Sequence, residues 1–183
     1  MTEHFGMKPS VSLEPLCWEK DLAALYRYMT TEEQYLFSTK VLHLSPQRFE
    51  EWLAAKLDSD FHDFYMVRGT DGTTVGYVHN YGFSTVNRHC KLVTYIVPEQ
   101  RQYGLGAQAT VLFMDNLFRR YPLEKLYSTV YAYNEESLQC NRRAGFVYEG
   151  TLKDFRYYDG KHWPLAYFSI TREQFYHRFG RFL

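Results

Sequence analysis

LVTYIVPEQRQYGLGAQA, residues 92 to 109, is the stretch that decides how this chain folds. A run of β-type apolar residues ends at Pro98 and leads through Arg101-x-x-Gly104-x-Gly106 into a helical pattern. Glycine has no Cβ, so a turn at Gly104 and Gly106 can reach positive φ and bring backbone N–H groups close to a ligand. The first amides of a helix lack intrahelical partners, and the helix dipole favours negative charge there. The stretch therefore predicts a strand, a phosphate-binding turn and a helix.

Arg101 adds a positively charged guanidinium beside this turn. Two known phosphate-binding loops, the dinucleotide fingerprint and the Walker loop, can be compared with the turn. In the dinucleotide fingerprint the first glycine follows its strand almost directly, and an acidic residue closes the second strand. Here residues 98–103 intervene, and the next apolar run has Glu124 in front of it and Asn134 behind it, so this fingerprint fits poorly. No Gly-Lys-Ser/Thr follows, which excludes a Walker loop. A glycine-rich turn that only joins a strand to a helix stays open from this segment alone.

Composition sets bounds on the class of protein. A chain of 183 residues with 45% hydrophobic residues fits one domain with a proper core. The 21 basic and 21 acidic side chains cancel, so charge gives no argument for a nucleic-acid or membrane-surface partner. The segment MTEHFGMKPS has no apolar signal region and no run reaches the length of a membrane span, so we expect a soluble, cytoplasmic protein. Cys17, Cys90 and Cys140 are expected to be reduced packing residues, and no metal site is predicted.

Hydrophobic periodicity and turn signals predict a continuous α/β domain without linker or repeat. Ser45-Pro46 marks a capped helix, and Asp-Gly pairs mark two hairpins. The expected elements are a strand from Val11 to Leu13, helices over 18–29 and 46–57, strands over 61–68, 74–84 and 91–97, a helix from Gly104 to about Tyr121, a strand over 126–131, a helix over 137–144, and a final hairpin over 146–158 and 163–170.

A second motif follows about thirty residues after the glycine turn. Asn134-x-x-Ser137 followed by Gly145-Phe146, together with Val97-Pro98 and the Arg101 to Gly106 turn, resembles the GNAT superfamily of acyl-CoA-dependent N-acetyltransferases. The likeness spans about residues 10 to 172 and is closest to the branch with ribosomal-protein alanine and spermidine acetyltransferases. It implies an α/β (α+β) fold with a mixed, mostly antiparallel, splayed sheet of about seven strands and about four helices. It also implies one N-acetyltransferase domain over 10–172, with 173–183 as its helical C-terminal tail.

The resemblance implies acetyl-CoA as the acyl donor. The strand that ends at Val97 is expected to splay from the strand over 126–131, which leaves unpaired amides to bind pantetheine and to polarise the thioester carbonyl near Ile96 or Val97. Asn134 is also a good helix N-cap residue, so a purely structural role for it stays open. The expected cofactor-binding residues are Ile96, Val97, Arg101, Gln102, Tyr103, Gly104, Leu105, Gly106, Ala107, Asn134, Ser137 and Asn141.

The implied reaction is direct attack on the thioester by a primary amine of a small molecule or a protein N-terminus. Two departures from the family pattern concern proton transfer. Many relatives have a tyrosine seven residues after the motif asparagine, where this chain has Asn141, and no acid stands in the segment 88–91 before the turn. Asn141, His89 and Tyr81 are the candidate catalytic residues, with His79 a further proton relay. These departures motivate the alternative of a non-catalytic acyl-CoA-binding or regulatory module, and a dinucleotide-binding oxidoreductase ranks third.

Aromatic residues make up 19% of the chain. Tyr26, Tyr35 and Phe37 lie in or after the first predicted helix and are expected to line the acceptor site, with Tyr157 from the last hairpin on the other side. Such a wall favours a hydrophobic amine or a cation held by cation–π contact, while core packing remains the alternative. Exposed aromatics near the last strands are compatible with a homodimer.

Overall fold

The computed structural model describes residues 10–31, 34, 43–58 and 60–181. Tyr35 and Phe37, two of the predicted acceptor residues, lie outside them. The described elements follow one another along the chain in this order: β1 (Val11–Pro15), α1 (Trp18–Thr30), α2 (Pro46–Leu57), β2 (Phe64–Gly69), β3 (Thr74–Ser84), β4 (His89–Ile96), the 3₁₀ helix η2 (Pro98–Tyr103), α3 (Leu105–Arg120), β5 (Lys125–Tyr131), α4 (Glu135–Arg143), β6 (Val147–Tyr158), β7 (Lys161–Thr171) and α5 (Arg172–Phe179).

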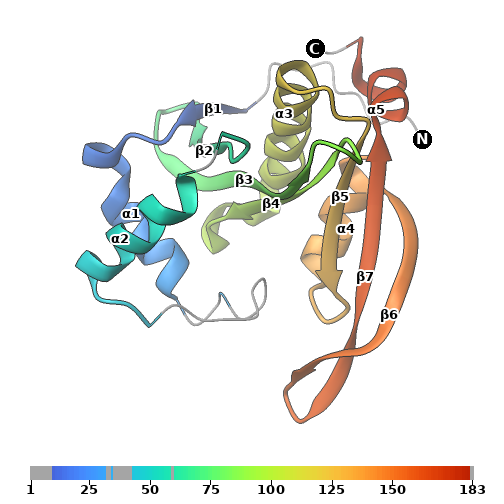
Figure 1. Ribbon diagram of the computed structural model, residues 1–183. Coiled ribbons are helices and arrows are strands. Elements are labelled where there is room, and N and C mark those ends of the chain that lie inside the picture. The colour runs from blue at the N-terminus through green and yellow to red at the C-terminus, as the bar shows by residue number, and fades with distance from the viewer. Residues whose placement is uncertain (1–9, 32–33, 35–42, 59, 182–183) are drawn as a thin grey trace.

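The strands form one sheet in the order β1-β2-β3-β4-β5-β7-β6, and every neighbouring pair is antiparallel except β4 and β5 (Figure 1). The predicted mixed, mostly antiparallel sheet is therefore confirmed. The described residues form five α-helices where about four were expected, and α5 occupies the predicted C-terminal tail. The hairpin of β6 and β7 extends well beyond the rest of the sheet. None of the described helices is both long and apolar enough to cross a bilayer.

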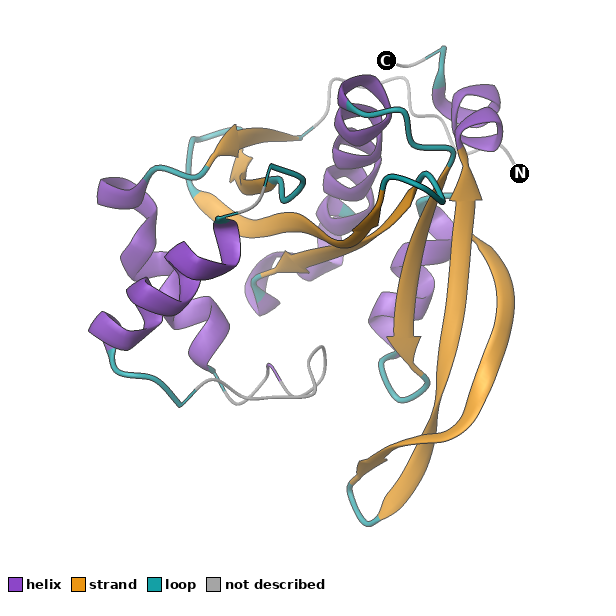
Figure 2. Ribbon diagram, in the orientation of Figure 1, coloured by secondary structure: helices purple, strands orange, loops and turns teal. Residues whose placement is uncertain are grey.

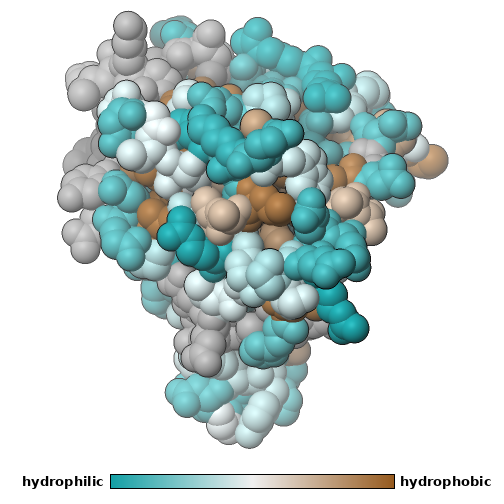
Figure 3. Space-filling model, turned by 90° about the vertical axis from the view of Figure 1, so that its left-hand side faces the viewer, coloured by the Kyte–Doolittle hydropathy of each residue, from teal (hydrophilic) through white to brown (hydrophobic). Residues whose placement is uncertain are grey.

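Helices lie on both faces of the sheet, as Figure 2 shows. Side chains alternate between faces along a strand, and on β4 Leu92 and Ile96 pack in one core with α3, whereas Tyr95 packs in a second core with α1 and α2. The α3 core also holds Phe175 and Phe179 of α5, both almost fully buried. Seen from the side of α1 and α2, the surface is mostly hydrophilic, with a few hydrophobic residues between polar ones (Figure 3).

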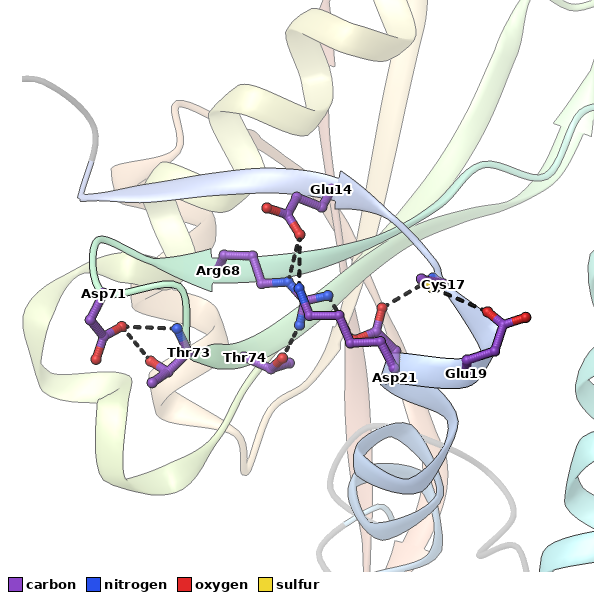
Figure 4. A network of polar contacts seen from close by, with 9 residues as sticks. Glu14, Cys17, Glu19, Asp21, Arg68, Asp71, Thr73 and Thr74 are labelled. Atoms are coloured by element: carbon purple, nitrogen blue, oxygen red, sulfur yellow. Dashed lines mark hydrogen bonds and ion pairs between the residues drawn. The ribbon is translucent and has the colours of Figure 1, made fainter.

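A buried ion pair fixes α1 against the sheet (Figure 4). The Nη2 atom of Arg68 on β2 lies 2.7 Å from Oδ1 of Asp21 on α1, and both side chains are almost fully buried. The Nε atom of Arg68 donates to Glu14 of β1 at 2.9 Å. Hydrogen bonds to both carboxylates stabilise the charged guanidinium and raise the pKa of Arg68 against the opposing effect of burial. These contacts therefore hold β1, α1 and β2 together.

Turn and cap chemistry set the ends of the elements near the site. Ser45 accepts a hydrogen bond from the amide of Arg48, and Pro46 is the first residue of α2, as the Ser-Pro pair predicts. Gly72 has a φ of 79°, which the hairpin between β2 and β3 requires. Both ends of α2 and the start of β3 coincide with their predicted positions.

Candidate active site

The site begins where two parallel strands separate. β4 and β5 pair only from His89 with Lys125 to Lys91 with Tyr127, although β4 continues to Ile96 and β5 to Tyr131. Beyond Lys91 the two strands diverge, which is visible as the opening between their ribbons in Figure 2. This is the splay that the sequence resemblance implies. It leaves the outer half of β4 without a partner on the side of β5.

Backbone hydrogen bonds show which β4 amides face this gap. The amide of Val97 donates to the carbonyl of Val75 on β3 at 2.9 Å. Because successive amides of a strand point in opposite directions, those of Ile96 and Thr94 are directed toward β5. Val97 was predicted alongside Ile96 as a donor to the thioester, and the structure corrects this, since its N–H is already bonded to β3. Thr94 instead carries the second amide that is directed toward β5.

The glycine turn ends at the start of α3. Gly104 is the N-cap of α3 with a φ of 70°, the left-handed conformation that glycine adopts without strain. Its carbonyl accepts the amide of Gln108, so the preceding amides from Leu105 to Ala107 have no intrahelical partner. Gly106 does not share the predicted positive φ, because it lies inside α3. Its missing side chain provides space instead, since a Cβ there would lie 3.4 Å from Sγ of Cys140.

Arg101 connects the turn to the elements around it. Its Nε donates to the carbonyl oxygen of Ile96 at 2.9 Å, and its Nη1 lies 3.4 Å from a carboxylate oxygen of Glu136 on α4. The guanidinium carbon is 5.7 Å from the centre of the Tyr95 ring. The positive charge is thus held at the end of β4, beside the first turn of α3.

A cavity of about 350 Å³ lies between the turn, β4 and α4. Among the predicted cofactor residues it brings together Ile96, Arg101, Gly104, Gly106, Ala107 and Ser137. The other five lining residues, namely Thr94, Glu136, Gln139, Cys140 and Arg143, are not among the predicted cofactor residues. Four of these follow one another at helical spacing on α4, so the helix periodicity of that segment was the signal that could have identified them. Of the remaining predicted residues, Leu105 packs its side chain in the α3 core, and η2 contains Gln102 and Tyr103.

The two asparagines predicted near the cofactor are bonded within α4. Oδ1 of Asn134 accepts the amide of Ser137 at 3.1 Å, which is the N-cap role that stayed open in the sequence. Nδ2 of Asn141 donates to the carbonyl of Ser137 at 3.1 Å, and the side chain is buried. Both bonds therefore stabilise α4 itself.

The candidate proton-handling residues lie at different places on the sheet. His89 is the first residue of β4, in the part still paired with β5, and packs edge-on against Tyr127. Tyr81 is partly exposed, and its hydroxyl lies 3.5 Å from Oγ1 of Thr129 on β5, near the point where the strands separate. His79 is buried and stacked against Phe64, and burial lowers the pKa of His79 to about 3. His79 is therefore neutral at ordinary pH.

The two described acceptor candidates occupy unlike environments. Tyr26 packs edge-on against Phe49 in the α1–α2 core, and its hydroxyl donates to the carbonyl of Leu44 at 2.9 Å. Tyr157 is 65% exposed on β6 and contacts His162 of β7. Core packing, the alternative left open for the first-helix aromatics, thus describes Tyr26.

Comparisons with known proteins agree with this geometry. The model of the acetyltransferase (GNAT) domain family matches residues 16–164. The SPbeta prophage-derived uncharacterized N-acetyltransferase YokL of Bacillus subtilis strain 168 is 23% identical over 146 residues, covering 79% of this chain and 82% of that protein. A crystal structure of spermidine N-acetyltransferase from Vibrio cholerae, in complex with CoA and spermine, is 18% identical with a TM-score of 0.83, covering 92% of this chain and 99% of that one. The structural likeness shows a shared fold.

Proposed function

Since this chain belongs to the GNAT acetyltransferase family, we propose that a primary amine attacks acetyl-CoA directly in the gap between β4 and β5. The protein is an acetyl-CoA-dependent N-acetyltransferase, which transfers an acetyl group to an amine.

The diphosphate of the cofactor binds at the start of α3. The amides from Leu105 to Ala107, which have no partner within the helix, and the positive end of the helix dipole favour an anion there. Arg101 of η2 and Arg143 of α4 both line the same cavity and supply positive charge to it. From this point pantetheine follows β4 toward the gap and pairs with the amides that β5 leaves free.

The chemistry needs no covalent enzyme intermediate. With the thioester carbonyl against the amide of Thr94 or Ile96, the negative charge that develops on its oxygen meets a donor already in place. The amine nitrogen attacks the carbonyl carbon, the C–S bond breaks, and CoA leaves as a thiolate that takes a proton from solvent. The nitrogen loses its proton to water or to a group at the gap, and Tyr81, whose hydroxyl lies 3.5 Å from Oγ1 of Thr129, is one candidate for that group. Proximity accounts for much of the rate.

The amine approaches from the sheet face opposite α3 and α4, because those helices and the cofactor occupy the other face. A small-molecule amine is supported by the Vibrio cholerae relative, which binds spermine together with CoA. A peptide with a free N-terminus is the second acceptor class, because the site opens at the surface beside the partly exposed Tyr81.

The observation that carries the proposal is the loss of β4–β5 pairing directly before a turn with a left-handed glycine. The test is thiol release from acetyl-CoA across polyamines, aminoglycosides, amino acids and peptides with free N-termini, with mass spectrometry of the products. Acetylation of the amine nitrogen in at least one class is expected. Tight binding of acetyl-CoA without turnover of any amine would overturn the proposal.

A further inference from the structure

Among the described residues, none of the side chains that β3, β4, β5 and β7 direct to the sheet face bordering the gap is a carboxylate, and the one carboxylate bonded to this face is that of Glu149 on β6, which accepts from Ser169. Alternate positions of β3, β4, β5 and β7 point to this face, and they hold aromatic, hydroxyl, apolar and basic residues. These positions are Tyr77, His79, Tyr81, Lys91, Val93, Tyr95, Tyr127, Thr129, Tyr131, Leu165, Tyr167 and Ser169. These twelve positions carry no acidic residue, and the Glu149 carboxylate beside Ser169 is already paired with Lys125.

Lys91 lies at the point where the gap opens. It forms the last β4–β5 pair, with Tyr127, and its side chain points to the acceptor face. Its Nζ is 5.9 Å from the centre of the Tyr81 ring and 5.5 Å from that of Tyr167. Across the part of the chain that the structure describes, no carboxylate oxygen lies within ion-pair distance of this ammonium group. The cation is held by two rings and keeps its hydrogen-bond donors for a ligand.

The ring faces around the gap are already in contact with cations of the protein. Besides Lys91, Arg156 lies 5.4 Å from the centre of the Tyr131 ring, and Lys125 lies 5.0 Å from that of Tyr127. Lys125 is matched by Glu149 of β6 at 2.7 Å, so its charge is compensated. A cationic group of an acceptor would therefore have to compete with these side chains for the rings and would be repelled by Lys91.

We propose that the acceptor is a small primary amine that carries an anionic group, a carboxylate or a phosphate, and that Lys91 binds this group. The inference rests on the proposed function and names its substrate class. Lys91 precedes Thr94 by three residues, which is about 10 Å along an extended strand. A small molecule with its amine at the thioester and its anion near Lys91 fits that separation, because the lysine side chain is long and mobile.

Matched substrates test the charge requirement. The pairs β-alanine and propylamine, tyrosine and tyramine, and O-phosphoethanolamine and ethanolamine differ in the anionic group, and spermidine adds a polycation. In at least one pair we expect kcat/KM to be about tenfold or more higher for the anionic member, the effect of one charge-assisted hydrogen bond. The carboxylate and phosphate pairs show which of the two anions is used.

Variants at Lys91 test the residue. Lys91→Gln should lower kcat/KM for the anionic amine by about ten- to a hundredfold, through KM, with unchanged affinity for acetyl-CoA. Lys91→Arg should retain most of the activity because it keeps the charge. Lys20→Gln on α1 is the matched control, since it removes the same charge from a side chain that is 59% exposed, far along the chain from the gap. The affinity for acetyl-CoA reports whether each variant is folded.

Two results separate failure of this inference from failure of the proposed function. If spermidine or the uncharged amines are acetylated as well as the anionic ones, or if Lys91→Gln behaves like Lys20→Gln, the inference is wrong and acetyl transfer to an amine stands. If the protein binds acetyl-CoA and acetylates no amine of either kind, the proposed function is overturned and the inference with it.

Discussion

The guanidinium of Arg101 and the carbonyl of Ile96 are joined by a hydrogen bond in which Nε donates to the oxygen at 2.9 Å. The bond holds η2 against the end of β4, where β5 is no longer paired with β4. The same side chain reaches Glu136 on α4. One arginine therefore connects the strand, the turn and the helix that enclose the cofactor cavity, and it holds a positive charge beside the proposed diphosphate site.

Replacing Arg101 by lysine should weaken binding of acetyl-CoA by about tenfold, because lysine keeps the charge but cannot reproduce the planar fork that bonds two partners. Isothermal titration calorimetry measures the affinity. Arg119→Lys on α3 is the control, since Arg119 is 61% exposed and pairs with Asp115 on its own helix. Equal affinities of the two variants would contradict this role of Arg101.

The buried pair of Arg68 and Asp21 should dominate the stability of the N-terminal part. Arg68→Met leaves the Asp21 carboxylate buried without its partner, and we expect a loss of about 3–5 kcal/mol in the free energy of unfolding. Removing both charges, with Asp21→Leu added, should recover part of this loss. Urea denaturation measures both values, and a loss below about 1 kcal/mol for Arg68→Met would show that the pair matters little.

His79 should make stability depend on pH. The pKa of His79 in the folded protein is about 3, below the ordinary value of 6.5, so the unfolded chain binds a proton that the folded protein excludes. The contribution is fully present above pH 6.5 and is lost as the pH falls toward 3. At about pH 5.5 the loss is about 1.4 kcal/mol relative to neutral pH.

Urea denaturation at about pH 7.5 and 5.5 checks this difference, and His79→Gln supplies the comparison. The variant should lose less stability than the native chain between the two conditions. His62 is 3.3 Å away, and burial also lowers the pKa of His62, so part of the effect should persist. An identical pH dependence in both proteins would show that His79 titrates normally in the folded state.

Local patterns predicted the elements well, because each has its own signal. The Ser45-Pro46 cap placed the start of α2, and the Asp71-Gly72 turn placed β3, so both agree with the structure. The order of elements and the family motifs together predicted a splayed sheet and the turn beside α3. These features depend on periodicity and on residues close together in the chain.

Features set by pairing between distant segments could not be predicted in the same way. The sequence does not show where β4 and β5 stop pairing, and the structure places the catalytic candidate His89 in the paired part. Nor does it show which way an amide points, and Val97 was therefore expected at the gap although it bonds to β3. Asn141 donates a hydrogen bond within its own helix. Whether an asparagine does so depends on its side-chain rotamer, which the residue type alone does not determine.

Titration of acetyl-CoA into the native protein and into Gly106→Leu tests the central claim that this cavity holds the cofactor. Gly106 lies between Ile96 and Cys140, so a leucine side chain there would occupy the space assigned to the cofactor. Ala55→Leu, at an exposed position of α2, is the control for a leucine introduced outside the cavity. We predict that the native protein and the control bind acetyl-CoA, and that folded Gly106→Leu binds it at least about a hundredfold more weakly. Unchanged affinity in folded Gly106→Leu would contradict the account.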